Sequence, residues 1–184
     1  LGHAGFIAIG SYSGAILGKM MNGLPGLFAG MAVGVVISVI VAFLVGLPTL
    51  RLKGDYLAIA TLGVAEIIRV AVTNMKITNG AAGISGVPLT NTWTITYIAL
   101  VLTTILILNY TFSSAGRATY AVLQDEIAAE SMGVQVTKYK ILAFVLGAAT
   151  ASIGGTLSAT TLGAVTPSDF TFMKSIDVLI IVVF

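Results

Sequence analysis

The sequence predicts an all-α protein, a polytopic bundle of transmembrane helices. Hydrophobic residues make up 57% of its 184 residues, and Asp, Glu, Lys and Arg make up only 9%, against about a quarter in soluble domains. The mean hydropathy of +1.04 comes from long uncharged segments with short polar connections between them, which is typical of repeated membrane spans. The one sizeable charged stretch, residues 116–140, is then expected to lie in water or on a partner protein.

Composition also excludes several classes of function. Cysteine is absent and His3 is the one histidine, so a disulfide framework, a thiolate or histidine metal cluster and a cysteine nucleophile are excluded. The formal net charge of +2 is too small to indicate nucleic-acid binding. The sequence contains no Gly-x-x-x-x-Gly-Lys-Ser/Thr phosphate loop. We therefore expect no cofactor and no enzymatic activity in this chain.

Both ends of the sequence are expected to be cuts within a longer protein. The chain begins at Leu1 instead of Met and ends within the apolar run IDVLIIVVF. No basic stretch precedes a short apolar segment, so a cleavable signal peptide is not predicted. The prediction is a fragment truncated at both ends.

The apolar segments predict the helices in chain order. Residues 4–17 are short and glycine-rich, which indicates the end of a truncated span or a broken, re-entrant piece. Residues 24–47 carry no charge and are long enough, at about 1.5 Å per residue, to cross a hydrocarbon core of about 30 Å. The other expected segments in the lipid bilayer are residues 56–73, 93–112, 141–165 and 175–184.

Small residues recur every fourth position in three of these segments. On a helix they share one face, where a neighbouring backbone can approach closely. Glycine is common in membrane helices in any case, but the same spacing in two consecutive segments favours close helix contact. The third face also contains Ala151. The predicted packing glycines are Gly10, Gly14, Gly18, Gly26, Gly30, Gly34, Gly147 and Gly155.

Glu66 and Arg69 are charges inside the apolar segment 56–73. A charge at mid-membrane costs roughly 2.5–3.5 kcal/mol on insertion scales, but residues three apart on a helix can pair. Two interpretations stay open: the pair reaches the interface near a helix end, or it faces the bundle interior or an aqueous pathway. Thr61 joins them as a candidate pathway residue, although its hydroxyl can also bond to its own helix.

The connections predict the orientation of the bundle. If each long segment crosses once, residues 48–55 and 116–140 share one side, which carries more Lys and Arg than the other. Basic residues are enriched in cytoplasmic loops, so residues 116–140 are expected in the cytoplasm. A re-entrant course of residues 56–73 would break this parity. Residues 74–91, rich in Gly, Asn, Thr and Pro, are predicted to be a loop.

Within the charged stretch, residues 118–132 are predicted to form one amphipathic helix. Asp125, Glu126 and Glu130 fall largely outside its contact face, and Gly133 is suited to stop the helix. From the pattern alone, a solvated helix without a partner is the alternative. The residues of the contact face follow i, i+3, i+4 spacing: Ala118, Ala121, Val122, Ala128, Ala129 and Met132.

Five stretches together identify a family. They are GHAGFIAIGSY (2–12), RLKGDYLAIATLGVAEIIRV (51–70), TNGAAGISGVP (78–88), GRATYAVLQDEIAAESMGVQVTKYKILAF (116–144) and GAVTPSDFTFMKSI (163–176). They resemble the permeases of branched-chain amino acid ABC transporters, and among these the M-type of the two paired permeases. The resemblance runs over essentially the whole chain.

This resemblance implies a cytoplasmic coupling helix that docks on an ATPase. In ABC importers that helix carries Glu-Ala-Ala, three residues, then Gly. Ala128, Ala129 and Gly133 match the pattern, whereas Ile127 stands at the Glu position and Glu126 lies one place earlier. The resemblance thus implies that Glu126, Ala128, Ala129 and Gly133 are the ATPase-coupling residues.

The resemblance also implies partners, cargo and location. The assembly would contain ATP-binding subunits, a second homologous permease and an external solute-binding protein, in the bacterial or archaeal inner (plasma) membrane. The multi-pass chain would translocate branched-chain amino acids. The alternatives are an amide or urea permease of the same family, or a stand-alone ion-coupled secondary transporter that uses Glu66.

Overall fold

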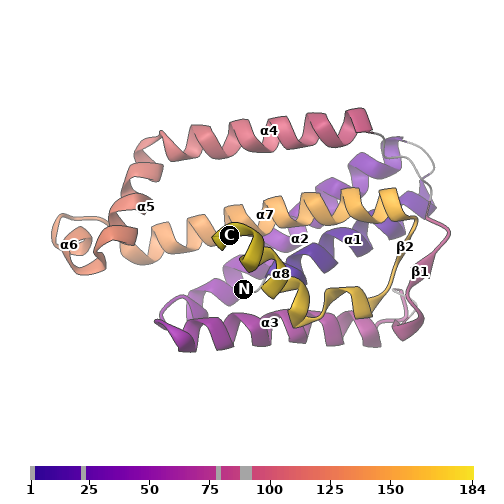
Figure 1. The fold of residues 1–184 in the computed structure, drawn as a ribbon, viewed down its shortest axis with the longest axis horizontal. Coiled ribbons are helices and arrows are strands. Elements are labelled where there is room, and N and C mark those ends of the chain that lie inside the picture. Colours follow the sequence, from indigo (N-terminus) through magenta and orange to yellow (C-terminus); the bar gives the residue numbers. More distant parts are fainter. Residues whose placement is uncertain (1–2, 22–23, 78–79, 88–92) are drawn as a thin grey trace.

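The computed structural model describes residues 3–21, 24–77, 80–87 and 93–184. Within them the chain is almost entirely helical, which confirms the predicted fold class (Figure 1). The α-helices are α1 (His3–Met20), α2 (Leu24–Thr49), α3 (Asp55–Asn74), α4 (Trp93–Thr111), α5 (Ser114–Gln124), α6 (Glu126–Ser131), α7 (Val136–Leu162) and α8 (Phe172–Val183). The short elements are η1 (Gly80–Ala82), β1 (Ile84–Ser85), β2 (Ala164–Val165) and η2 (Pro167–Phe170).

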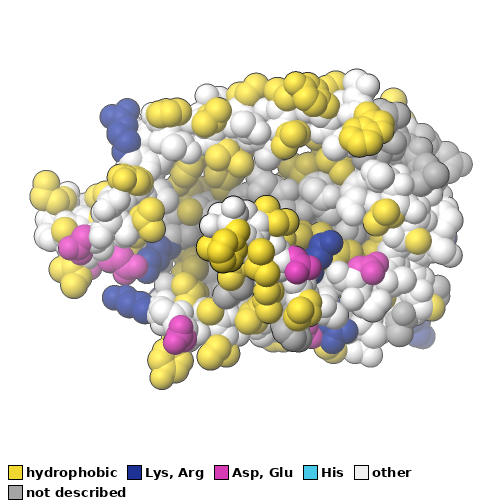
Figure 2. Space-filling view, viewed as in Figure 1, with side chains coloured by type: hydrophobic (Ala, Val, Ile, Leu, Met, Phe, Trp, Pro, Cys, Tyr) yellow, Lys and Arg dark blue, Asp and Glu magenta, His cyan; other side chains and the backbone are white. Residues whose placement is uncertain are grey.

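Four of the described helices, α2, α3, α4 and α7, are long and apolar enough to cross a membrane. Apolar side chains cover much of the face over α4, whereas many of the charged side chains gather around α5 and α6 at one end (Figure 2). α3 is one unbroken helix of 20 residues, about 30 Å long at 1.5 Å per residue. Its length argues against a re-entrant course of residues 56–73.

α1 is not the broken, re-entrant piece that was one of its two predicted forms, whereas the end of a truncated span stays a prediction. It is a continuous helix of 18 residues that packs against α7, α2 and α3. Its glycine, alanine and serine residues are buried. Small residues suit a helix enclosed by other helices better than one that faces lipid, which explains why this segment is less apolar than the others.

Glycines allow α1 to lie against α7 and α2 at backbone distance. A Cβ at Gly10 would collide with the carbonyl oxygen of Ser152 in α7, and one at Gly155 would collide with the carbonyl of Ile7. On the other side of α1, a Cβ at Gly34 would lie 3.2 Å from the Cα of Gly10. Glycine is therefore required where these three helices meet.

Of the five other predicted packing glycines, four are buried or lie at close contacts and one does not. Gly14 and Gly30 face each other, since a Cβ at Gly30 would lie 2.7 Å from the Cα of Gly14. Gly26 lies against the end of α1, and Gly18 is buried within α1. Gly147 instead meets only the Nε2 atom of His3 at 3.3 Å, so it does not hold two helix backbones together.

Hydroxyl groups bond across the same contacts. Thr156 Oγ1 donates to the Gly10 carbonyl at 2.9 Å, and Ser11 Oγ donates to the Gly155 carbonyl at 2.9 Å. Ser13 Oγ donates to the Gly30 carbonyl at 3.1 Å. Hydrogen bonds from Ser and Thr contribute about 0.6–2 kcal/mol each between membrane helices, so they add to the packing that glycine permits.

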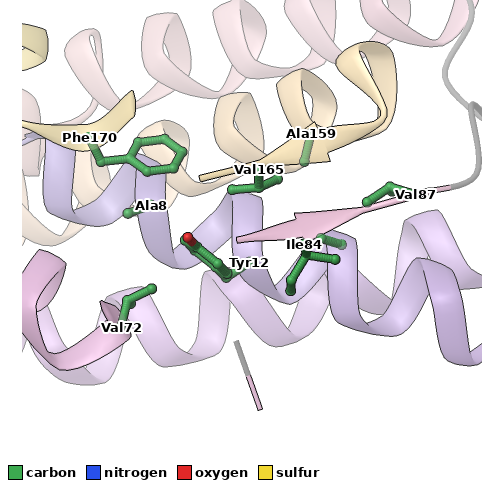
Figure 3. Packing of buried hydrophobic residues seen from close by; sticks show 9 residues of the cluster. Ala8, Tyr12, Val72, Ile84, Val87, Ala159, Val165 and Phe170 are labelled. Atoms are coloured by element: carbon green, nitrogen blue, oxygen red, sulfur yellow. The ribbon is translucent and has the colours of Figure 1, made fainter. Parts of the chain in front are cut away.

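The main apolar cluster (Figure 3) closes the end of the bundle that lies away from α6 (Figure 1). β1 and β2 pair antiparallel there, with Ile84 opposite Val165. Tyr12 of α1 packs on Phe170 of η2, with ring centroids 6.1 Å apart. The pairing joins the connection after α3 to the connection after α7. Residues 78–79 and 88–92 of the predicted 74–91 loop lie outside the described residues.

Two predicted segments change their bounds. α7 begins at Val136 instead of residue 141 and ends at Leu162, where Gly163 takes a left-handed conformation with φ 76°. Such a glycine commonly ends a helix, so the expected span 141–165 loses its last three residues. α8 likewise begins at Phe172 rather than at residue 175. A helix can continue into polar sequence beyond its apolar part, which hydropathy alone does not predict.

Candidate functional site

The charged stretch forms two helices, α5 and α6, so the prediction of one helix over residues 118–132 is wrong. Asp125 separates them in an extended conformation, with φ −160° and ψ 111°. Its Oδ1 atom accepts hydrogen bonds from the amides of Ile127 at 3.0 Å and Ala128 at 3.1 Å. An aspartate that caps a new helix competes with continuation of the old one. The chain therefore changes direction at Asp125.

Gly133 ends α6 after six residues. Its φ is 87° and its amide donates to the Glu130 carbonyl at 3.1 Å, while the Val134 amide donates to the Ala129 carbonyl at 3.0 Å. This pair of bonds is a Schellman motif, which glycine favours because side chains are strained at positive φ. With Asp125 at one end and Gly133 at the other, α6 is a short helix with defined limits.

The change of direction exposes bulky side chains instead of the predicted alanine face. Ile127 is 77% exposed and Met132 is 84% exposed, whereas Ala129 is only 5% exposed and faces its own chain. Ala128 is exposed beside Ile127. The predicted single contact face is therefore wrong, because the break at Asp125 rotates α6 relative to α5. We call the exposed set Tyr120, Leu123, Ile127 and Met132 the apolar tip.

The apolar tip lies at the end of the molecule that carries α5 and α6 (Figures 1 and 2). Apolar side chains of this size on a surface rich in charge mark a place of contact with another molecule. A groove of about 540 Å³ runs beside α6 and is lined by charged side chains, among them Arg51 and Glu130. The arrangement therefore offers an apolar centre with polar groups around it, as protein interfaces do.

The carboxylate of Glu126 forms ion pairs with two lysines of its own chain. Its Oε1 atom lies 2.5 Å from Lys140 Nζ of α7, and its Oε2 atom lies 3.7 Å from Lys53 Nζ in the connection between α2 and α3. The hydrogen bond from Lys140 and the two positive charges lower the pKa of Glu126. Glu126 thus joins α6 to two other parts of the bundle, and residues 48–55 and 116–140 lie at the same end, as the orientation argument requires.

The candidate pathway residues lie on α3. Thr61 is buried, and its hydroxyl donates to the carbonyls of Leu57 at 3.0 Å and Ala58 at 2.9 Å in its own helix. Glu66 and Arg69 pair, with Arg69 Nη2 2.9 Å from Glu66 Oε2 and about a third of each side chain exposed. The pairing agrees with the three-residue spacing. A role in a pathway stays a prediction for all three.

Neutralising Glu66 alone is expected to destabilise the protein more than neutralising the pair. Glu66→Gln leaves the Arg69 cation without its 2.9 Å partner in an apolar helix, whereas Glu66→Gln with Arg69→Gln removes both charges. We expect a cost of about 1–3 kcal/mol for the single change, below the 3–5 kcal/mol of a fully buried pair. Thermal unfolding of the protein in detergent measures this cost, and a double variant as unstable as the single one would contradict the pairing.

Three features of the site escaped the sequence analysis: the break at Asp125, the exposure of Ile127, and the contacts of Glu126 with lysines. A signal existed for the first, because an aspartate followed by glutamate is typical of a helix start. The other two depend on how α6 is rotated against α7, which helical periodicity does not contain.

The whole chain was compared with known proteins. Residues 1–184 match the family model for the branched-chain amino acid transport system permease component. The chain is 36% identical over 218 aligned positions to the high-affinity branched-chain amino acid transport system permease protein LivM of Salmonella typhimurium strain LT2. It is 35% identical to LivM of Escherichia coli strain K12. Each alignment covers all of this chain and 51% of the relative, and no solved structure matches.

Proposed function

This chain belongs to the family of branched-chain amino acid transport permease components, and from that membership we propose that it is a membrane-spanning part of an ATP-driven importer. The proposed cargo is a branched-chain amino acid that an external solute-binding protein delivers. ATP hydrolysis is assigned to separate ATP-binding subunits, with a second homologous permease beside this one in the inner membrane. The chain spans about half the length of its curated relatives.

The apolar tip is the observation that carries the proposal. α6 is limited by Asp125 and Gly133, so it presents Ile127 and Met132 in a defined position outside the bundle. Binding energy at interfaces concentrates in a few central side chains that become fully desolvated. We assign the apolar tip to the ATPase contact, together with Ala128, which lies exposed next to Ile127.

The other predicted coupling residues then act by positioning. Ala129 is buried against its own chain, Gly133 ends the helix, and Glu126 joins α6 to Lys140 of α7 and to Lys53 before α3. A displacement of α6 by the ATPase would reach α7 and α3 through Glu126 as well as along the chain. The ATPase would then be connected through α6 to two membrane-spanning helices, α7 and α3.

Glu126→Gln is expected to lower the amount of amino acid taken up per ATP while the ATPase still binds. Glutamine has no charge to hold the two lysines, and the apolar tip is unchanged. The ratio of uptake to hydrolysis in proteoliposomes and co-purification of the ATPase measure the two effects. Exchange of charges in Glu126→Lys with Lys140→Glu is expected to restore part of the ratio. A ratio equal to that of the wild type in Glu126→Gln would contradict the positioning role.

The lowered pKa predicts how pH acts on these contacts. Because the pKa of Glu126 in the folded state lies below its ordinary value of 4.5, its ion pairs stabilise α6 fully above that value. Their contribution is lost as the pH falls through the folded-state pKa. Transport coupling is therefore expected to be independent of Glu126 titration at neutral pH.

Reconstitution tests the proposed function as a whole. The full-length permease, its partner permease, the ATP-binding subunits and the binding protein are placed in proteoliposomes, and labelled leucine is supplied with or without ATP. Uptake that requires ATP is expected. Uptake driven by an ion gradient without the ATPase would favour a secondary transporter, although Glu66 is already paired with Arg69 at 2.9 Å. Uptake of amides or urea instead of leucine would favour the other branch of the family.

A further inference from the structure

We propose that the end of the bundle away from α6 holds a binding pocket for a zwitterionic amino acid with a small apolar side chain. The inference rests on the proposed function and names the place where its cargo is held. The pocket is a cavity of about 200 Å³ between α1, α7, β2, η2 and α8. The residues that carry the argument are Ile7, Leu162, Val165, Asp169, Phe170 and Lys174.

Opposite charges line this cavity without pairing with each other. Asp169 and Lys174 both line it, yet the ion pairs within 4.0 Å among the described residues do not include this couple. An α-amino acid carries an ammonium and a carboxylate on one carbon. Its two groups can satisfy both side chains at once, with Asp169 accepting from the ammonium and Lys174 donating to the carboxylate.

The carboxylate of Asp169 is oriented by hydrogen bonds and can accept further hydrogen bonds. Its Oδ2 atom accepts hydrogen bonds from Thr166 Oγ1 at 2.9 Å and from the Thr166 amide at 3.4 Å, which form a capping box at η2. A carboxylate has about four lone-pair sites, so these two bonds orient it and leave sites for an ammonium. A group oriented in advance loses less entropy on binding.

Two buried side chains form part of the apolar lining of the cavity. Val165 and Phe170 are buried, and Phe170 rests on Tyr12 in the cluster of Figure 3. Ile7 of α1 and Leu162 of α7 complete the apolar lining. At about 200 Å³ the cavity is smaller than the roughly 300–1,000 Å³ of sites for drug-sized ligands, which suits one small molecule with a short branched side chain.

A second cavity of the same volume has no charged residue in its lining. It lies between α2, α4 and α7, and its lining is apolar except for Thr103, with Phe28, Ile98 and Leu102 among its residues. Such a lining suits a lipid tail or another apolar side chain and offers a zwitterion no partner for its charges. The cavity with Asp169 and Lys174 combines charge with apolar surface. It also lies at the far end of α7 from α6, about 40 Å away at 1.5 Å per residue.

Photo-crosslinking tests the pocket in membranes that contain the complete transporter. Photo-leucine, the diazirine analogue of leucine, is activated by light and the labelled residues are mapped by mass spectrometry. Labelling is expected at Ile7, Val165 or Phe170. Leucine should suppress it, whereas isocaproate, which lacks the ammonium, and isoamylamine, which lacks the carboxylate, should not.

Substitutions of single charged residues distinguish loss of amino-acid recognition from a general effect of removing a charge near the cavity. Asp169→Asn and Lys174→Gln are each expected to lower labelling roughly tenfold, the effect of losing one charge-assisted hydrogen bond. Asp177→Asn is the matched control, because Asp177 lies on α8 three residues from Lys174 and does not line the cavity. It should label like the wild type.

The outcomes distinguish this pocket from the proposed function. If the wild-type transporter takes up leucine with ATP but photo-leucine labels none of the lining residues, the pocket is refuted and the function stands. Equal suppression by isocaproate would also refute it, because the ammonium would then play no part. If the complete wild-type assembly takes up no leucine at all, the proposed function itself fails.

Discussion

Replacement of Ile127 and Met132 by aspartate is expected to detach the ATPase from the permease and to abolish ATP-driven uptake. Both side chains are exposed at one end of the bundle, at 77% and 84%, so the free protein loses little packing. In the complex they would be desolvated, where a central side chain contributes about 2 kcal/mol or more. Two such losses correspond to an affinity decrease of roughly 1,000-fold.

Co-purification of the ATP-binding subunit with the full-length permease measures this loss. Ser114→Asp is the matched control, because Ser114 is exposed at the start of α5 and receives the same charge outside both the apolar tip and the groove beside α6. Membrane insertion and thermal stability are expected to stay unchanged in both variants. Retention of the ATPase by the double variant would refute the assignment of the apolar tip.

Alanine is expected to destabilise the protein at one of two adjacent glycines of α7 and to leave its stability unchanged or higher at the other. A Cβ at Gly155 would collide with the carbonyl oxygen of Ile7 and lie 3.0 Å from the amide nitrogen of Ser11. Both are backbone atoms of α1, so α1 and α7 must separate, at a cost of about 1–3 kcal/mol. A Cβ at Gly154 meets nothing within 4 Å, so alanine there adds helix propensity of about 0.5–1 kcal/mol.

Thermal unfolding of the full-length permease in detergent compares the two substitutions. Gly155→Ala should lower the midpoint, and Gly154→Ala should leave it unchanged or raise it. Because the two sites share helix, depth and chemistry, each serves as the control for the other. Equal decreases would show that the close approach of α1 and α7 is not what selects glycine at position 155.

Some parts of the site could be predicted because they depend on neighbours in the chain. The pairing of Glu66 with Arg69 needs only a three-residue spacing, and the end of α6 needs only Gly133 at the right place. The path of the chain through Asp125 was missed because the alanine pattern on both sides suggested one period. One local hydrogen-bonding group outweighed that pattern by capping a new helix at Ile127 and Ala128.

By itself the sequence determined the helical class, the spans α2, α3, α4 and α7, the family, and the position of the charged stretch between two spans. Hydropathy and spacing decide these features, and both are properties of consecutive residues. Only the tertiary structure decided that α1 lies at the centre, that Gly155 rather than Gly154 touches a neighbour, and that Glu126 faces its own bundle. These features depend on how helices are rotated against one another, because rotation chooses which side chain of each turn meets protein and which remains exposed.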